Sequence, residues 1–223
     1  MIKHSDLHKN SSVDGTFYKY LYYSVSALFV LLEAQNWVDF KLILLLKTLL
    51  MPCLALYAHS EGASRVLLAA LGFACLGDFT LDYLRLDQQS EDMWFMSGML
   101  SFLVMQFLYI LLMRSNPIHR VIPKQVTIFY ALFFFFGNAT LGPHLGPLQI
   151  PVIFYSAALS YMAATSSGIS IKAGLGGLIF WVSDFLIIFK QLGIEFDGRA
   201  SLVYVTYIVA QWLIVDEMIK KKL

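Results

Sequence analysis

Charged side chains are scarce in this sequence. Asp, Glu, Lys and Arg make up 14% of the 223 residues, whereas apolar residues make up 58%. A soluble domain averages about 25% charged and about 45–50% apolar residues. Because the deficit of charge extends along the whole chain, it excludes a sizeable soluble domain and indicates a protein with several membrane spans. The net charge of +1 gives no reason to expect a nucleic-acid partner.

Cysteine and histidine are also few. The two cysteines, Cys53 and Cys75, both fall in apolar runs, which favours buried free thiols over a disulfide. The five histidines lie outside those runs without the spacing of metal ligands, so we expect no metal and no cofactor. The sequence has no Gly-x-Ser-x-Gly elbow, P-loop or dinucleotide fingerprint. If the protein is an enzyme, carboxylates and tyrosines must therefore carry the chemistry.

Eight apolar runs approach or reach the length that crosses a bilayer as a helix, about 17–25 residues. None of them alternates like a barrel strand, and a helix satisfies its own backbone groups in lipid. We therefore predict an all-α polytopic bundle with spans over residues 18–34, 40–58, 64–84, 95–113, 125–141, 148–165, 173–192 and 200–215. We expect a polar N-terminal tail over residues 1–16, a membrane domain over 17–218 and a basic tail over 219–223. No short apolar region precedes the first run, so we expect no removable signal peptide.

Basic residues predict the orientation of these spans. Eleven of the sixteen lysines and arginines fall on the side that holds both termini, four fall on the other side, and Lys47 lies inside a span. The excess predicts that both termini face the cytoplasm, which requires an even number of spans. Polar residues on the second, third and fourth runs also recur at similar spacing on the sixth, seventh and eighth, which suggests two parallel four-helix repeats.

Two aspartates interrupt apolar runs at similar depth. Asp78 lies seven residues before Arg85 at the outer end of the third run, and Asp184 lies six residues before Lys190 at the outer end of the seventh. Both helices are predicted to run in the same direction, so the two carboxylates should lie at one level. Charges at such depth are costly, and residues that carry them are rare and usually functional.

Other polar residues are predicted near this level and suggest a polar cavity within the bundle. They are Lys47, Asn138, Tyr155 and Tyr207, with Gln106 and Gln211 deeper. Simpler roles stay open: the lysine could snorkel, the tyrosines could lie in an interfacial belt, and the glutamines could link helices. The two aspartates could likewise be structural carboxylates, paired with the lysine or capped by tyrosines. Asp82, one turn after Asp78 and close to the helix end, is expected to be a solvated rim charge.

A pattern of order and spacing extends from the second to the eighth predicted helix. It consists of Lys47; Gly77-Asp78 with Leu81; Phe95-x-x-Gly98-x-x-x-Phe102 with Tyr109; Pro151-x-x-x-Tyr155 with Met162; Phe180-x-x-Ser183-Asp184; and Arg199-Ala200-Ser201-Leu202 with Thr206-Tyr207-x-Val209-Ala210-Gln211. In this pattern the chain resembles the YhhN-like family of membrane lysoplasmalogenases, which includes the animal transmembrane lysoplasmalogenases. The N-terminal tail lies outside the resemblance.

The resemblance implies hydrolysis of the vinyl ether bond of lysoplasmalogens, lysophospholipids of the bilayer, to a fatty aldehyde and a glycerophospho-ethanolamine or -choline. Asp78 and Asp184 would be catalytic, and the binding or supporting residues would be Lys47, Gln106, Tyr109, Asn138, Tyr155, Tyr207 and Gln211. The family usually has a histidine where this chain has Gln106, and glutamine cannot titrate. This departure suggests a slower enzyme, a different substrate or lost activity.

Two buried carboxyls also suit vinyl ether hydrolysis independently of the family resemblance. Hydrolysis begins with protonation of the outer alkene carbon, so one carboxyl must be neutral, and burial favours that form. An ionised carboxylate can stabilise the resulting cation and orient water. Two other classes of function compete with this hypothesis. A proton- or ion-coupled transporter would use similar intramembrane residues, and a non-catalytic lipid-binding relative would explain Gln106.

Overall fold

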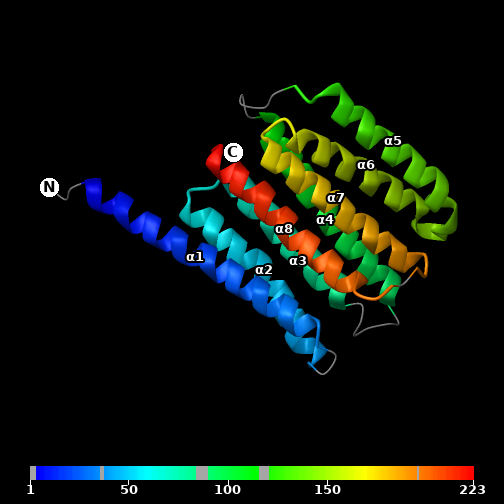
Figure 1. Cartoon of the computed structure of the whole chain (residues 1–223), viewed down its shortest axis with the longest axis horizontal. Coiled ribbons are helices and arrows are strands. Elements are labelled where there is room, and N and C mark those ends of the chain that lie inside the picture. The colour runs from blue at the N-terminus through cyan, green and yellow to red at the C-terminus, as the bar shows by residue number, and fades with distance from the viewer. Residues whose placement is uncertain (1–3, 36–37, 84–89, 116–120, 195) are drawn as a thin grey trace. The chain divides into compact units, whose positions relative to one another are not determined.

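The computed structural model describes residues 4–35, 38–83, 90–115, 121–194 and 196–223 (Figure 1). Within these residues the fold is all-helical, which confirms the predicted fold class. The α-helices are α1 (His4–Glu33), α2 (Phe40–Ser60), α3 (Arg65–Tyr83), α4 (Glu91–Ser115), α5 (Lys124–Leu141), α6 (Gln149–Ser166), α7 (Ile171–Gln191) and α8 (Arg199–Lys220). Two short 3₁₀ helices, η2 (Gly142–His144) and η3 (Gly146–Leu148), connect α5 to α6.

Seven of the described helices, α2 to α8, are long and apolar enough to cross a membrane, so the chain is an integral multi-pass membrane protein. The predicted run at 18–34 lies within α1, which is not among the seven. This helix is less apolar because four tyrosines and Lys19 fall between residues 18 and 23. It also begins at His4, so much of the predicted polar tail is helical. The sidedness of the termini and the domain boundaries stay predictions.

The chain forms two compact units, and the boundary between them falls within α4. The first unit comprises residues 1–105 and the last two residues. In it α1 packs along α2, and α2 packs along α3 (Figure 1). Helix α3 approaches α4 closely at two glycines: a Cβ on Gly77 would lie 2.7 Å from the ring of Phe102, and one on Gly98 would lie 2.6 Å from Leu81. These contacts need glycine and help set the rotation of α3 about its axis.

The second unit comprises residues 106–221. In it α5 packs on α6, α6 on α7, and α7 on α8 (Figure 1). Two consecutive glycines let α7 approach both neighbours closely. A Cβ on Gly176 would lie 2.9 Å from Ile214 of α8, and one on Gly177 would lie 2.9 Å from the Cα of Ala163 on α6. Helix α7, which carries Asp184, is therefore tightly packed on two sides.

Candidate functional site

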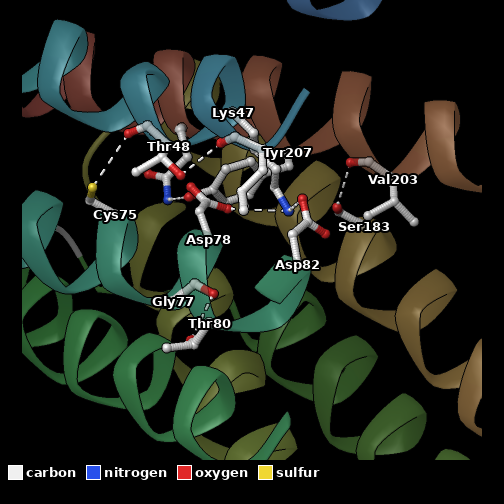
Figure 2. Close-up of polar contacts among 12 residues, drawn as sticks. Lys47, Thr48, Cys75, Gly77, Asp78, Thr80, Asp82, Ser183, Val203 and Tyr207 are labelled. Carbon is white, nitrogen blue, oxygen red and sulfur yellow. Dashed lines mark hydrogen bonds and ion pairs between the residues drawn. The ribbon is translucent and has the colours of Figure 1, made fainter. Parts of the chain in front are cut away.

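Lys47 and two aspartates form a buried ionic cluster between α2 and α3 of the first unit (Figure 2). The Nζ of Lys47 lies 3.0 Å from Oδ2 of Asp82 and 3.8 Å from Oδ1 of Asp78. The exposed fractions of the three residues are 6%, 5% and 2%, respectively. The two carboxylates lie one turn apart on α3, which places both on the face toward Lys47. The cluster therefore holds one positive charge and two acidic groups away from solvent.

The expectation that Asp82 is a solvated rim charge is wrong. Its carboxylate is buried, and it is nearer to Lys47 than the carboxylate of Asp78 is. The physical reason is that the long side chain of Lys47 extends from α2 to cover the end of α3, and burying Asp82 without that cation would be costly. Lys47 is thus an ion-pair partner inside the protein, not a lysine that snorkels to the membrane surface.

Asp184 has a different kind of partner in the second unit. The hydroxyl of Tyr155 on α6 donates a short hydrogen bond to Oδ2 of Asp184 on α7. Asp184 is 8% exposed and Tyr155 is partly buried. Adjacent Ser183 donates to the carbonyl of Val203 on α8 at 2.9 Å (Figure 2). Because successive residues of a helix point about 100° apart, anchoring Ser183 to α8 turns Asp184 away toward α6.

Gln106 lies close to this tyrosine. Its side chain is completely buried, at 0% exposure, and it interacts electrostatically with the hydroxyl of Tyr155. Among the described residues, neither its amide nitrogen nor its amide oxygen makes a hydrogen bond of ordinary geometry. A buried amide of this kind can donate a hydrogen bond to, and accept one from, a neutral polar ligand such as a water molecule or a hydroxyl group.

Three further predicted site residues form a hydrogen-bonded chain in the second unit. Tyr109 on α4 donates to the amide oxygen of Gln211 on α8 at 2.8 Å. The amide nitrogen of Gln211 in turn donates to the hydroxyl of Tyr207 at 3.2 Å. Tyr207 also contacts the ring of Phe180 on α7 edge to face. This chain links α4 to α8, which is the helix-linking role considered for Gln211.

Asn138 bonds between α5 and α6. Its side-chain nitrogen donates to the carbonyl of Phe134 at 2.8 Å and to the hydroxyl of Ser156 at 3.0 Å. The structure thus brings together Lys47 with Asp78 in one unit, and Gln106, Tyr155 and Asp184 in the other. That Asp78 and Asp184 act on one substrate stays a prediction.

Sequence reasoning did not identify all the buried charges. Arg199, one of the four basic residues that the sequence puts on the side opposite the termini, is buried and donates to the carbonyl of Leu186 at 3.4 Å. Asp216 is buried as well and pairs with Lys220 one turn later on α8. The spacing of Asp216 and Lys220 signals their pairing, whereas no local pattern signals the burial of Arg199.

The fold and these side chains define a polytopic helical membrane protein with ionisable groups buried inside its spanning helices. Residues 42–218 match the model of the YhhN family. Because the match covers most of the chain, the protein belongs to the YhhN family, which confirms the resemblance. All the residues discussed above as site residues lie within the matched region. Comparisons with curated proteins and with solved structures gave no match.

Proposed function

We propose that this protein hydrolyses the vinyl ether bond of lysoplasmalogens. The YhhN family includes lysoplasmalogenases, and the chain belongs to it. The observation that carries the proposal is a difference between two buried aspartates. Asp78 shares a single lysine with another carboxylate, whereas Asp184 accepts a hydrogen bond from a tyrosine. Environments that separate two carboxyls in this way favour different protonation states, which is what acid catalysis with charge stabilisation requires.

Asp78 is the proposed proton donor. Lys47 lies 3.0 Å from Asp82 and 3.8 Å from Asp78, so the two carboxylates share this lysine at unequal distances. We assign the transferable proton to Asp78, because it is the carboxyl of this buried cluster that lies farther from Lys47. A neutral carboxyl at this position can transfer its proton to the outer carbon of the vinyl ether. Asp82 is a positioning residue that holds the ammonium of Lys47 closer to itself than to Asp78, at 3.0 Å against 3.8 Å.

Asp184 is the proposed carboxylate that stabilises charge. The hydroxyl of Tyr155 donates to Asp184, and a donated hydrogen bond favours the ionised form. An ionised carboxylate stabilises the oxocarbenium ion that forms when the alkene carbon takes the proton. The same carboxylate can accept a proton from the water molecule that attacks this cation. Gln106, beside Tyr155, supplies the amide that would hold that water.

The reaction balances with water as its only co-reactant. Protonation of the outer alkene carbon gives a cation on the ether oxygen and its neighbouring carbon. Water adds to that carbon and gives up a proton, forming a hemiacetal. The hydroxyl proton of the hemiacetal moves to the ether oxygen as the bond between this carbon and that oxygen breaks, which releases the fatty aldehyde and a glycerophospho-ethanolamine or -choline. Asp184 takes one proton from the attacking water and releases it to solvent, and Asp78 takes one proton from solvent, so both groups return to their starting state.

The direct test is incubation of purified protein with lysoplasmalogen and detection of the fatty aldehyde by mass spectrometry. A saturated alkyl-ether lysolipid is the matched control substrate, because it lacks the alkene that must be protonated. Aldehyde from the vinyl ether alone is the expected result. Absence of aldehyde across a range of pH values and head groups would falsify the proposal.

A proton- or ion-coupled transporter is the second candidate. The buried ion pair of Lys47 and Asp82 between two spanning helices favours it, because such residues often mark ion pathways. A transporter would move solute into proteoliposomes in response to a gradient and would release no aldehyde. A non-catalytic lipid-binding relative would do neither.

A further inference from the structure

A groove lies between α5, α6 and α7 of the second unit. Its volume is about 60 Å³, and its walls include Phe133 and Gly137 of α5, Val152 and Ser156 of α6, and Phe185 of α7. All three helices are long and apolar enough to span the membrane, so the groove lies between candidate membrane-spanning segments. A pocket that encloses a whole ligand measures roughly 300–1,000 Å³, so this groove suits a segment of a chain.

The lining of the groove favours an apolar occupant. None of the described residues that line it is charged. Its side-chain N–H groups are already engaged within the protein: Asn138 donates to Ser156, and the indole of Trp181 donates to Ser160 at 3.3 Å. A head group would find no cation there to pair with its phosphate. Most of the remaining surface is aromatic or aliphatic, which suits a hydrocarbon chain.

The groove flanks the pair of Tyr155 and Asp184. Asp184 lies one helical turn from both Trp181 and Ile188, which line the groove. Tyr155 lies one turn from Val152, which lines it from α6. A chain seated in the groove would therefore run beside the carboxylate proposed to stabilise the cation.

The outer wall of the groove is loosely packed. Of the residues of α5, Tyr130 is buried, whereas Phe135 and Phe136 are strongly exposed. Gly137 leaves a gap in that wall, because an added Cβ there would meet no atom within 4 Å.

We propose that this groove binds the hydrocarbon chain of a single-chain lipid and holds it beside Asp184. The inference rests on the proposed function, since it names the subsite for the chain that carries the vinyl ether. The small volume favours one chain, and the uncharged lining leaves the head group outside.

The test uses full-length protein in nanodiscs and a saturated alkyl-ether lysophospholipid that carries a diazirine in its chain. This probe cannot be hydrolysed by the proposed reaction, so its labelling does not depend on turnover. We expect photolabelled peptides from the α5, α6 and α7 walls. In Gly137→Leu the added Cβ meets no atom within 4 Å and the larger side chain stands at a position that lines the groove, so we expect labelling to fall about tenfold because contacts with the chain are lost.

Gly72→Leu on α3 is the matched control. An added Cβ there also meets no atom within 4 Å, and Gly72 does not line the groove. Labelling of the three walls should be unchanged in this variant. Equal labelling of wild type and Gly137→Leu would overturn the proposal. A diacyl lipid with the same photoreactive chain provides a second test. If it labels the groove as strongly as the lysolipid does, and Gly137→Leu lowers that labelling too, the groove is a general lipid site and the proposal is overturned.

The two proposals fail separately. If the groove is labelled by the lysolipid probe but no vinyl ether is cleaved, the chain subsite stands and the hydrolase proposal falls. If vinyl ether is cleaved but the groove is not labelled, the hydrolase proposal stands and the chain subsite falls.

Discussion

The ammonium of Lys47 lies 3.0 Å from a carboxylate oxygen of Asp82, in an ion pair buried between two membrane-spanning helices. Asp78 is farther from the same ammonium, at 3.8 Å. The lysine therefore has a closer partner than the aspartate that the family pattern identifies. We infer that Asp82 controls the charge on Asp78, by holding the cation that would otherwise ionise it.

The first prediction follows from this competition. In Asp82→Asn, Lys47 is released to pair with Asp78 and hold it ionised, so Asp78 can no longer donate a proton. Aldehyde production at neutral pH should fall by about 10²-fold, within the range for loss of general acid catalysis. The deficit should shrink as the pH is lowered, because protonation of Asp78 becomes easier. A rate profile against pH for the variant and the wild type checks both points.

Asp216→Asn is the control for this prediction. Asp216 is also buried and paired with a lysine, Lys220, but it lies near the end of α8 and outside the proposed site. Its substitution should leave turnover within about twofold of wild type, as expected for an ion pair whose lysine is exposed. If both variants behave alike, Asp82 has no special relation to catalysis.

The second prediction concerns the two proposed catalytic residues. Asp78→Asn and Asp184→Asn each preserve shape but remove the carboxyl, and each should lower turnover by about 10²–10⁴-fold. Residues that act as a unit are not additive, so the double variant should be little slower than either single one. Initial rates of aldehyde release from folded, monodisperse protein provide the measurement. Near-wild-type rates in both single variants would show that the two aspartates are structural and not catalytic.

The helices were predictable because the apolar runs are separated by short polar and turn-forming stretches. The predicted run at 40–58 corresponds to α2 (Phe40–Ser60), and the run at 125–141 corresponds to α5 (Lys124–Leu141). The helical form of residues 4–16 was not predicted, since their polar composition lacks the apolar periodicity that identifies a helix.

The site was predictable in composition but not in its pairings. A carboxylate within an apolar run is visible in the sequence, so Asp78 and Asp184 could be selected directly. The partner of each depends on how neighbouring helices rotate, and packing at Gly77, Gly176 and Gly177 influences that rotation. The burial of Asp82 by Lys47 also depends on how α2 packs against α3. The position of Asp82 near a helix end therefore did not predict its burial.

The third prediction concerns the hydrogen bond between Tyr155 and Asp184. Tyr155→Phe removes the donor and leaves the carboxylate less well stabilised. A hydrogen bond to a charged group contributes about 1.5–3 kcal/mol, so turnover should fall roughly 10- to 100-fold. Tyr130→Phe is the matched control, because Tyr130 is buried among apolar side chains of α5, α6 and α7. Equal rates for the two variants would remove Tyr155 from the proposed mechanism.

The fourth prediction concerns α1. The distribution of basic residues predicts that both termini face the cytoplasm, and that topology requires α1 to cross the membrane in addition to α2–α8. Single cysteines introduced at Ser11 and Lys221, in a background with Cys53 and Cys75 replaced, should both be protected from an impermeant thiol reagent in intact cells. Labelling of one position alone would show that seven helices cross and that α1 lies on the membrane surface.

The fifth prediction separates stability from function at Gln106. Its buried amide makes no ordinary hydrogen bond with a described residue, and an unsatisfied buried polar group costs about 1–3 kcal/mol. Gln106→Met keeps the size of the side chain and removes that cost, so the unfolding temperature in detergent should rise by a few degrees. Turnover should fall, because the amide proposed to hold the attacking water is gone.

Gln211→Met is the matched comparison for this fifth prediction. Gln211 is equally buried, but its amide is bonded to Tyr109 and Tyr207, so the same substitution leaves two hydroxyls without their partner. The unfolding temperature should fall in this variant while it rises in Gln106→Met. A rise in stability with unchanged turnover at position 106 would show that the amide binds nothing during the reaction. Lower stability at position 106 would show instead that its amide is satisfied in the folded protein. The expected result is a higher unfolding temperature in Gln106→Met, a lower one in Gln211→Met, and a loss of turnover in Gln106→Met. This combination would identify Gln106 as a residue whose amide binds water or substrate during the reaction.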